Sequence, residues 1–287
     1  MLDRTLSGRS VVDRLLTVAV WSSALAVSAV FLWLLGDLIA HGVGQLSWGF
    51  FVEAPRDAGR AGGIGPVLVS TAAILAVCLG TALPLGLGTA LLLVEFTRHD
   101  DPLGRAVRRS LDVLAGVPSI VFGLFGNALF CIALGLGFSI LSGGLTLACM
   151  VLPILIRSTE EGLRAVPQEM RLGAAALGMG RVRSLWHLLL PAAAPGLAVG
   201  IVLGFGRAIA ETAALIFTSG YVARVPESLY DSGRSLSIHI YDLAINVPGG
   251  EGRAYATALV LVAILLFTNA VSGFLADRWL HRRLLVP

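Results

Sequence analysis

Arg207 and Glu211 are charged residues, four positions apart, within an otherwise largely apolar stretch, 192–220. An arginine or an acidic side chain at the centre of a membrane span costs roughly 2.5–3.5 kcal/mol on insertion scales, so such groups pair or line a wet cavity. The spacing permits an ion pair within one helix. A guanidinium can donate two parallel hydrogen bonds to an oxyanion, and a neighbouring carboxylate can orient it and accept a proton-bearing substrate oxygen. The pair predicts either a structural link between helices or a site on an anion path.

Three glycines precede this pair at four-residue intervals: Gly196, Gly200 and Gly204. Small residues at this spacing let another helix approach backbone to backbone in lipid. At about 100° per residue, these glycines and the two charged residues share one face of a helix. The pattern predicts a helix-packing groove on the face that carries the charges.

The composition places these residues in a membrane protein. Hydrophobic residues make up 56% of the 287 residues and charged residues 14%, against roughly 25% charged in soluble domains. This excludes a soluble enzyme and a disordered chain. All 21 basic residues are arginine, so chemistry that needs lysine, including a P-loop, is excluded and any ATP must be bound by another chain. The three cysteines and five histidines lack metal-ligand spacing, and we expect no metal site and no cofactor.

Six stretches reach the length of about 20 apolar residues that a membrane-spanning helix needs. They are 18–40, 66–96, 111–134, 138–156, 192–220 and 254–276. The third and fourth are joined by Gly135-Leu136-Gly137, which predicts a tight hairpin. The first is longer than the 7–15 apolar residues of a signal peptide, which predicts an uncleaved span, although small residues at 24, 26 and 29 leave cleavage open.

Arginine placement predicts the orientation, because loops on the cytoplasmic side carry the excess of basic residues. With the N-terminal segment 1–17 inside, fifteen of the 21 arginines fall on inner segments, among them Arg98, and five on outer loops. We therefore expect both termini to be cytoplasmic.

The long inner segment 157–191 is expected to contain a short helix. Ser158 and Glu161 have capping-box spacing, which predicts a helix start, and Pro167 suits the first position of a further helix, about Pro167–Leu177. Gly178 and Gly180 are expected to end it, and Pro191 to open the next span. The short helix either projects into the cytoplasm or lies on the bilayer surface as a connector.

This segment resembles the cytoplasmic loop of type I ABC importer permeases. That loop reads E-A-A, three residues, Gly, nine residues, then I-x-L-P. Here the corresponding residues are Leu172-Gly173-Ala174, Gly178 and 188–191, so the spacing matches while Leu172 replaces the leading glutamate. Further segments resemble the phosphate permeases of that family: 62–66, 83–86, 117–126, 206–213 and 237–241.

The resemblance implies an all-α fold of six transmembrane helices, with a permease core at 62–280 that follows the first span. It implies a multi-pass protein of the bacterial inner membrane that imports phosphate and is not itself an enzyme. The implied partners are two copies of an ATP-binding subunit, a homologous sister permease, an extracytoplasmic phosphate-binding protein and membrane lipid, with no nucleic acid. It places Arg207 and Glu211 on the substrate path, and assigns coupling to the ATPase to Pro167, Arg171, Ala174, Gly178 and Pro191.

Alternative functions remain at this stage. The chain could serve another oxyanion, such as molybdate, tungstate or phosphonate, or be a secondary anion transporter that needs no ATPase. A membrane enzyme would need a nucleophile or metal constellation, and the sequence offers none. Pro118 predicts a kink or an interruption in the third span, and Glu95 and Asp112 are expected to be structural. The outer loop 221–253 is expected to hold a short helix at about 226–246, which either docks the binding protein or caps the channel.

Overall fold

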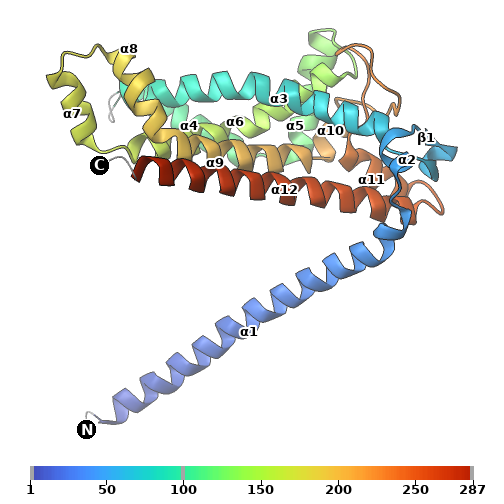
Figure 1. Cartoon of the computed structure of the whole chain (residues 1–287), viewed down its shortest axis with the longest axis horizontal. Coiled ribbons are helices and arrows are strands. Elements are labelled where there is room, and N and C mark those ends of the chain that lie inside the picture. Colours follow the sequence, from blue (N-terminus) through green and yellow to red (C-terminus); the bar gives the residue numbers. More distant parts are fainter. Residues whose placement is uncertain (1–2, 98–100, 285–287) are drawn as a thin grey trace.

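The computed structural model describes residues 3–97 and 101–284 and is almost entirely helical (Figure 1). Arg98, one of the inner arginines counted above, lies outside the described residues. Within these residues, five helices are long and apolar enough to cross a membrane, or six if one sharply bent pair counts as a span. The main helices are α1 (Asp3–Gly42), α3 (Gly65–Leu91), α6 (Ile140–Arg164), α9 (Leu190–Ile209) and α12 (Glu251–Leu284).

The core forms where α3 packs along α6, and α6 packs along α9. Ile74, Cys78, Leu147, Val151 and Leu155 are among its buried side chains. Helix α12 covers α9 and also contacts α11 (Leu236–Ile245) and the C-terminal end of α1. These contacts give a bundle whose long helices run roughly alongside one another (Figure 1).

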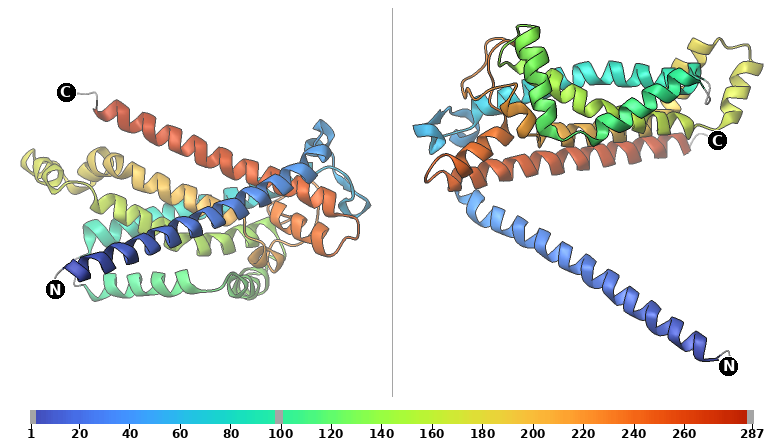
Figure 2. Two further views of the ribbon diagram at one scale, coloured as in Figure 1. Left: turned by 90° about the horizontal axis from the view of Figure 1, so that it is seen from below. Right: turned by 180° about the vertical axis from the view of Figure 1, so that it is seen from behind.

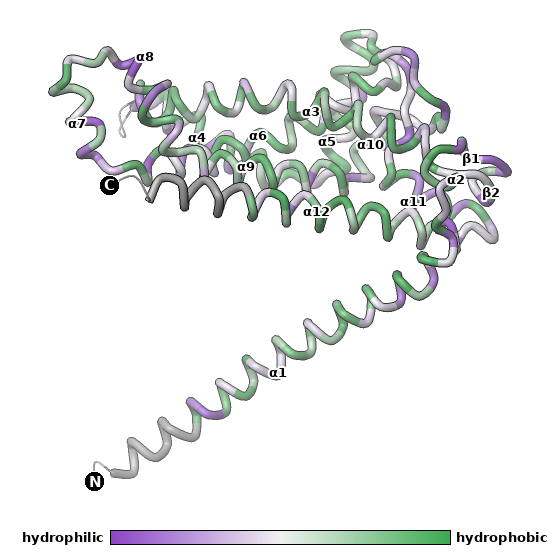
Figure 3. The backbone as a smooth tube through the Cα atoms, in the orientation of Figure 1, coloured by the Kyte–Doolittle hydropathy of each residue, from purple (hydrophilic) through white to green (hydrophobic). Residues whose placement is uncertain are grey.

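Helix α1 lies away from this bundle. It meets α12 near Gly42, where an added Cβ atom would lie 3.0 Å from the carbonyl oxygen of Tyr255. From there it diverges from the other helices along its whole length (Figure 2). Its 12–45 run is apolar, as the colouring in Figure 3 shows, and its most apolar 18-residue window is not buried within this chain. Its side chains are therefore available to lipid or to another chain.

The third predicted span is interrupted at Pro118, one of the two outcomes predicted from this proline. The chain forms α4 (Pro102–Gly116) and α5 (Ser119–Gly126), which continues as the π-helix η4 (Asn127–Ala133). The two parts are bent by 105°. Pro118 has no N–H and disfavours helical geometry at the residue before it. That residue, Val117, is extended, with a ψ angle of 130°.

The fourth span is longer than predicted. Helix α6 continues to Arg164, eight residues beyond the predicted end at 156. Ser158 and Glu161 therefore lie inside one helix, and the helix start predicted from their spacing is wrong. The predicted hairpin residues Gly135 and Gly137 both have positive φ angles, of 68° and 62°, which favour glycine.

After α6 the chain forms the short helix α7 (Gln168–Ala176). Pro167 is the N-cap residue and not the first helical residue, and Gly178 follows the helix with φ +70°. Helix α8 (Arg181–Ser184) and the π-helix η5 (Leu185–Leu189) then run into α9. The helical run thus begins at Arg181, and the prediction that Pro191 opens it is wrong. The wider π-helical turn just before Pro191 accommodates a residue that cannot donate a backbone hydrogen bond.

The other end of the bundle is built from short elements. They are η1 (Val43–Gln45), α2 (Trp48–Val52), β1 (Pro55–Arg56), η2 (Asp57–Gly59), β2 (Ala61–Gly62), α10 (Ala213–Ile216) and α11. Strands β1 and β2 pair antiparallel, with Pro55 opposite Gly62. Helix α11 falls within the predicted range 226–246 and is too short to cross a bilayer.

Candidate substrate path and coupling site

Arg207 and Glu211 form an ion pair across the end of a helix. Helix α9 ends at Ile209. The prediction that the two residues share one continuous helix is therefore wrong. Arg207 lies in its last turn and Glu211 in the break before α10. Nη1 of Arg207 donates to Oε2 of Glu211 at 2.5 Å. The Glu211 side chain is 3% exposed and that of Arg207 is 44% exposed, so a buried carboxylate orients an arginine that is open to a ligand.

Contacts from two other elements hold the break. The second carboxylate oxygen of Glu211, Oε1, accepts a hydrogen bond from the Ala214 N–H at 3.3 Å. The Ser237 hydroxyl on α11 donates to the Glu211 carbonyl at 2.6 Å. These contacts satisfy polar groups that the interrupted helix leaves without partners. Interrupted helices of this kind can present polar groups to a substrate within a membrane.

The three predicted packing glycines face α6. A Cβ atom at Gly196 would lie 2.5 Å from the Cα atom of Gly162, and one at Gly204 would lie 2.6 Å from Cγ1 of Val151. Gly200 packs against Ser158, at 3.0 Å. Helices α6 and α9 therefore cross backbone to backbone at Gly162 and Gly196. The sequence analysis did not single out Gly162, although Ser158 and Gly162 are small residues at four-residue spacing.

The predicted coupling residues are distributed over two elements. Arg171 and Ala174 on α7 both line a cavity of about 290 Å³ beneath this helix, and Ala174 is 4% exposed. Pro167 and Gly178 bound α7 at its two ends. Pro191 lies apart from them in sequence, in the first turn of α9.

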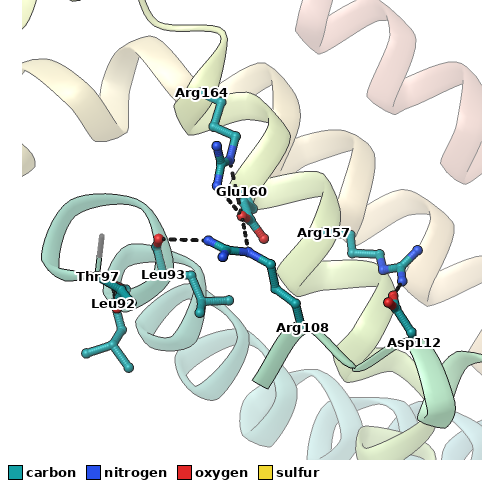
Figure 4. A network of polar contacts seen from close by, with 8 residues as sticks. All are labelled: Leu92, Leu93, Thr97, Arg108, Asp112, Arg157, Glu160 and Arg164. Carbon is teal, nitrogen blue, oxygen red and sulfur yellow. Dashed lines mark hydrogen bonds and ion pairs between the residues drawn. The ribbon is translucent and has the colours of Figure 1, made fainter. Parts of the chain in front are cut away.

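A second group of charged residues lies at the same end of the bundle as α7, and the sequence analysis missed its centre, Glu160. Its Oε1 atom accepts hydrogen bonds from Arg108 Nε at 3.1 Å and from Arg164 Nη2 at 2.8 Å (Figure 4). Arg108 also donates to the Leu93 carbonyl at 3.1 Å. The i, i+4 spacing of Glu160 and Arg164 was the one available signal.

The charged groups around Glu160 line a cavity of about 310 Å³ between α4 and α6. Asp112 and Arg157 form a further ion pair there (Figure 4). Together with the Glu160 contacts, this pair joins α4 to the last two turns of α6.

At the opposite end, His239 on α11 is buried next to Arg234. The Arg234 guanidinium lies 3.4 Å from His239 Nδ1 and 3.1 Å from Oδ2 of Asp242. Burial, and secondarily the arginine, lower the pKa of His239 from 6.5 to about 4. The imidazole is therefore neutral near pH 7. In residues 3–97 and 101–284, no group of three or more His, Cys, Asp or Glu side chains is arranged to hold a metal ion.

The chain belongs to the family of binding-protein-dependent transport system inner membrane components, which it matches over residues 82–285. This confirms the predicted family and identifies the chain as a multi-pass membrane component of a transport system. A probable ABC transporter permease protein of Bacillus subtilis, YqgI, is 30% identical, covering 95% of this chain and 96% of that protein.

Two further relatives are named phosphate transport system permease protein PstA. The one from Mycobacterium leprae is 32% identical and covers 94% of this chain and 91% of its own length. The one from Xylella fastidiosa is 34% identical and covers 81% of each chain. Both alignments include most of the helices described above.

Solved structures of ABC importers share the fold. A chain of the MetNI methionine ABC transporter, in an inward-facing conformation, has a TM-score of 0.58 at 15% identity and covers 75% of this chain and 96% of its own. A bacterial transporter that imports the acidic polysaccharide alginate gives a TM-score of 0.54 at 16% identity, covering 88% and 95%. The predicted all-α permease fold is confirmed.

Proposed function

We propose that this chain is the membrane-spanning permease subunit of an ATP-driven importer that carries inorganic phosphate across the bacterial cytoplasmic membrane. The Arg207–Glu211 pair carries this proposal. It puts a half-exposed guanidinium, oriented by a buried carboxylate, at a helix break in the membrane part of a transport component. The relatives named phosphate permeases support phosphate as the transported oxyanion.

Arg207 would bind the anion while Glu211 would discriminate among anions. The guanidinium suits an oxyanion through its fork of donors. Glu211 would accept a hydrogen bond from hydrogen phosphate, which carries a proton, whereas fully deprotonated sulfate has no proton to donate. The carboxylate would therefore favour phosphate over sulfate at neutral pH.

Energy would come from partner chains, since this chain has no lysine for a P-loop. We assign the end with α7 to the cytoplasm, with both termini, and the end with α11 to the outer face. Two ATP-binding subunits would drive transport through the loop 157–191, in which coupling is assigned to Pro167, Arg171, Ala174, Gly178 and Pro191. A sister permease would complete the channel around the 62–280 core, and an extracytoplasmic phosphate-binding protein would deliver the substrate.

Labelled-phosphate uptake by proteoliposomes that contain the whole system tests the proposal. We expect uptake that requires internal ATP on the ATPase side and that excess sulfate leaves unchanged. Uptake driven by an ion gradient without the ATPase would overturn the ATP-driven part of the proposal. Transport of molybdate, tungstate or phosphonate in preference to phosphate would overturn the substrate assignment and leave the permease class standing.

A further inference from the structure

Helix α7 packs on the bundle through Met170 and Ala174, and Arg171 adds hydrogen bonds to the bundle. Arg171 donates from Nη1 to the Val166 carbonyl at 2.8 Å and from Nη2 to the Leu163 carbonyl at 2.9 Å. These acceptors lie at and just beyond the end of α6. The same side chain donates from Nη2 to Oε1 of Glu95 at 2.9 Å, and from Nε to this atom at 3.3 Å. Arg171 therefore joins α7 to the ends of two membrane helices.

Glu95 belongs to the inner end of the second span. It lies in the π-helix η3 (Leu92–Phe96), which continues directly from α3. Its side chain is 19% exposed and that of Arg171 is 27% exposed. Partial burial strengthens such a pair relative to a fully hydrated surface ion pair. The contact spans 76 positions in the sequence, so it fixes tertiary structure and not local helix geometry.

The neighbouring charged group extends this connection to α4. Arg108 donates to the carbonyl of Leu93, two residues before Glu95 in the same π-helical turn, and to Glu160 on α6. The inner ends of α3, α4 and α6 are thereby joined to each other and, through Arg171, to α7. Figure 4 shows the part of this group around Glu160.

The exposed side of α7 carries leucines, whereas the side that faces the bundle carries Arg171. Leu172 and Leu177 are 62% and 82% exposed, while Arg171 is directed toward the bundle and Ala174 is buried. Figure 1 shows α7 at the extreme end of the bundle, beyond α3 and α6. An ATPase that contacts the exposed leucines would therefore move α7 without touching Arg171.

We propose that Arg171 and Glu95 are positioning residues that transmit the displacement of α7 to α3, and that Arg171 does not contact the ATPase. This inference rests on the proposed function, because it needs an ATPase that moves α7. It refines the coupling assignment of Arg171 and adds Glu95, which the sequence analysis treated as structural. The ion pair would act as the link between ATP hydrolysis and the rearrangement of the spans.

The first test compares Glu95→Gln and Arg171→Gln in the complete reconstituted complex, with Arg183→Gln on the exposed surface of α8 as the matched control. We expect both test variants to retain the ATPase on purification and to hydrolyse ATP within about twofold of the wild-type rate. Transport per ATP should fall about tenfold, because each variant removes the charge-assisted contact between α7 and η3. Arg171→Lys, which keeps the charge but loses the fork, should be intermediate.

Two outcomes would overturn the proposal. The first is normal transport per ATP in both Gln variants. The second is loss of ATPase binding in Arg171→Gln but not in Glu95→Gln, which would make Arg171 a partner contact.

A second measurement does not depend on the substrate. Spin labels at the exposed positions Leu92 on η3 and Glu169 on α7, with the three native cysteines replaced by alanine, report the separation of η3 and α7. ATP should leave the distance between the labels unchanged in the otherwise native chain. In the Glu95→Gln variant, ATP should lengthen this distance or broaden its distribution. A separation that changes equally in both proteins would contradict the transmission role. Because this readout needs no phosphate, it separates failure of the inference from failure of the substrate assignment.

Discussion

The two ends of the bundle are held together by different chemistry. At the end with α7, arginines reach carboxylates on other elements, as in the pairs of Arg108 with Glu160 and Arg171 with Glu95. At the other end, short hydroxyl side chains bond to the backbone. Thr71 accepts from the Leu236 N–H at 2.9 Å, and Ser237 donates to Glu211.

This difference has a mechanical consequence. A hydroxyl on a short side chain bonds only while its backbone partner stays in place. An arginine has a long flexible stem and several donors, so it can follow a moving acceptor. The hydroxyl-rich end is therefore suited to a fixed frame around the Arg207–Glu211 pair, and the arginine-rich end to a part that moves with α7.

The largest expected effect comes from a substitution where α6 and α9 cross, between the two ends of the bundle. Gly196→Ile would place a side chain where a Cβ atom alone lies 2.5 Å from the Cα atom of Gly162. Forced separation of α6 and α9 should cost more than about 3 kcal/mol of unfolding free energy. Thermal unfolding in detergent measures this loss. Gly80→Ile is the control, because nothing lies within 4 Å of a Cβ atom there, and equal melting of the two variants would contradict the crossing.

The next effect tests the arginine-rich end. Glu160→Gln removes the charge that two arginines share, and its side chain is only 12% exposed. We expect a loss of about 3 kcal/mol, because the two cations would be left close together. Glu161→Gln, on an exposed neighbour, should change the unfolding free energy by less than about 0.5 kcal/mol. Chemical denaturation of the two variants side by side would show whether Glu160 is the centre of this network.

The hydroxyl-rich end also contains a buried titratable group, His239. Its pKa is lowered from 6.5 to about 4, so the unfolded chain binds a proton that the folded chain does not. Stability from this group is complete above pH 6.5 and is lost as the pH falls toward 4. We expect a loss of about 2 kcal/mol between pH 6.5 and about pH 5. His239→Gln should flatten the unfolding profile in this window, and a slope that persists in the variant would assign it to another group.

The smallest effect concerns one hydroxyl. Ser237→Ala removes the donor to the Glu211 carbonyl and should cost about 1 kcal/mol. Because the lost hydrogen bond joins neutral groups, added salt should not alter this cost, whereas salt should reduce the difference between Glu160→Gln and the native chain. A salt-dependent cost for Ser237→Ala would contradict the proposed difference in chemistry between the two ends.

Much of the helical layout was predictable because apolar length alone marks a span. The residues at 66–96 match α3 and η3 closely for this reason. The breaks were less predictable. Pro118 indicated a kink, yet the 105° bend depends on how α5 packs against α6 and α10. The end of α9 before Glu211 carries no proline or glycine signal, and contacts from α10 and α11 hold it.

The charged residues also divide into those that the sequence made predictable and those that it did not. Arg207 and Glu211 were identifiable because lipid makes isolated charges costly in a span. Glu160 was not, because charged residues near the end of a span are common and its second arginine, Arg108, lies 52 positions away. Long-range partners of this kind follow from the tertiary arrangement and not from local spacing.

The most direct test of the account is phosphate uptake by the reconstituted complex with Arg207→Gln and Glu211→Gln combined. The double variant avoids leaving one buried charge unpaired, so the complex should assemble with its ATPase. We predict that uptake is nevertheless lost, because the guanidinium that would bind the anion is gone. Normal phosphate uptake by an assembled double variant would show that the pair only joins structural elements, and would contradict its place on the substrate path.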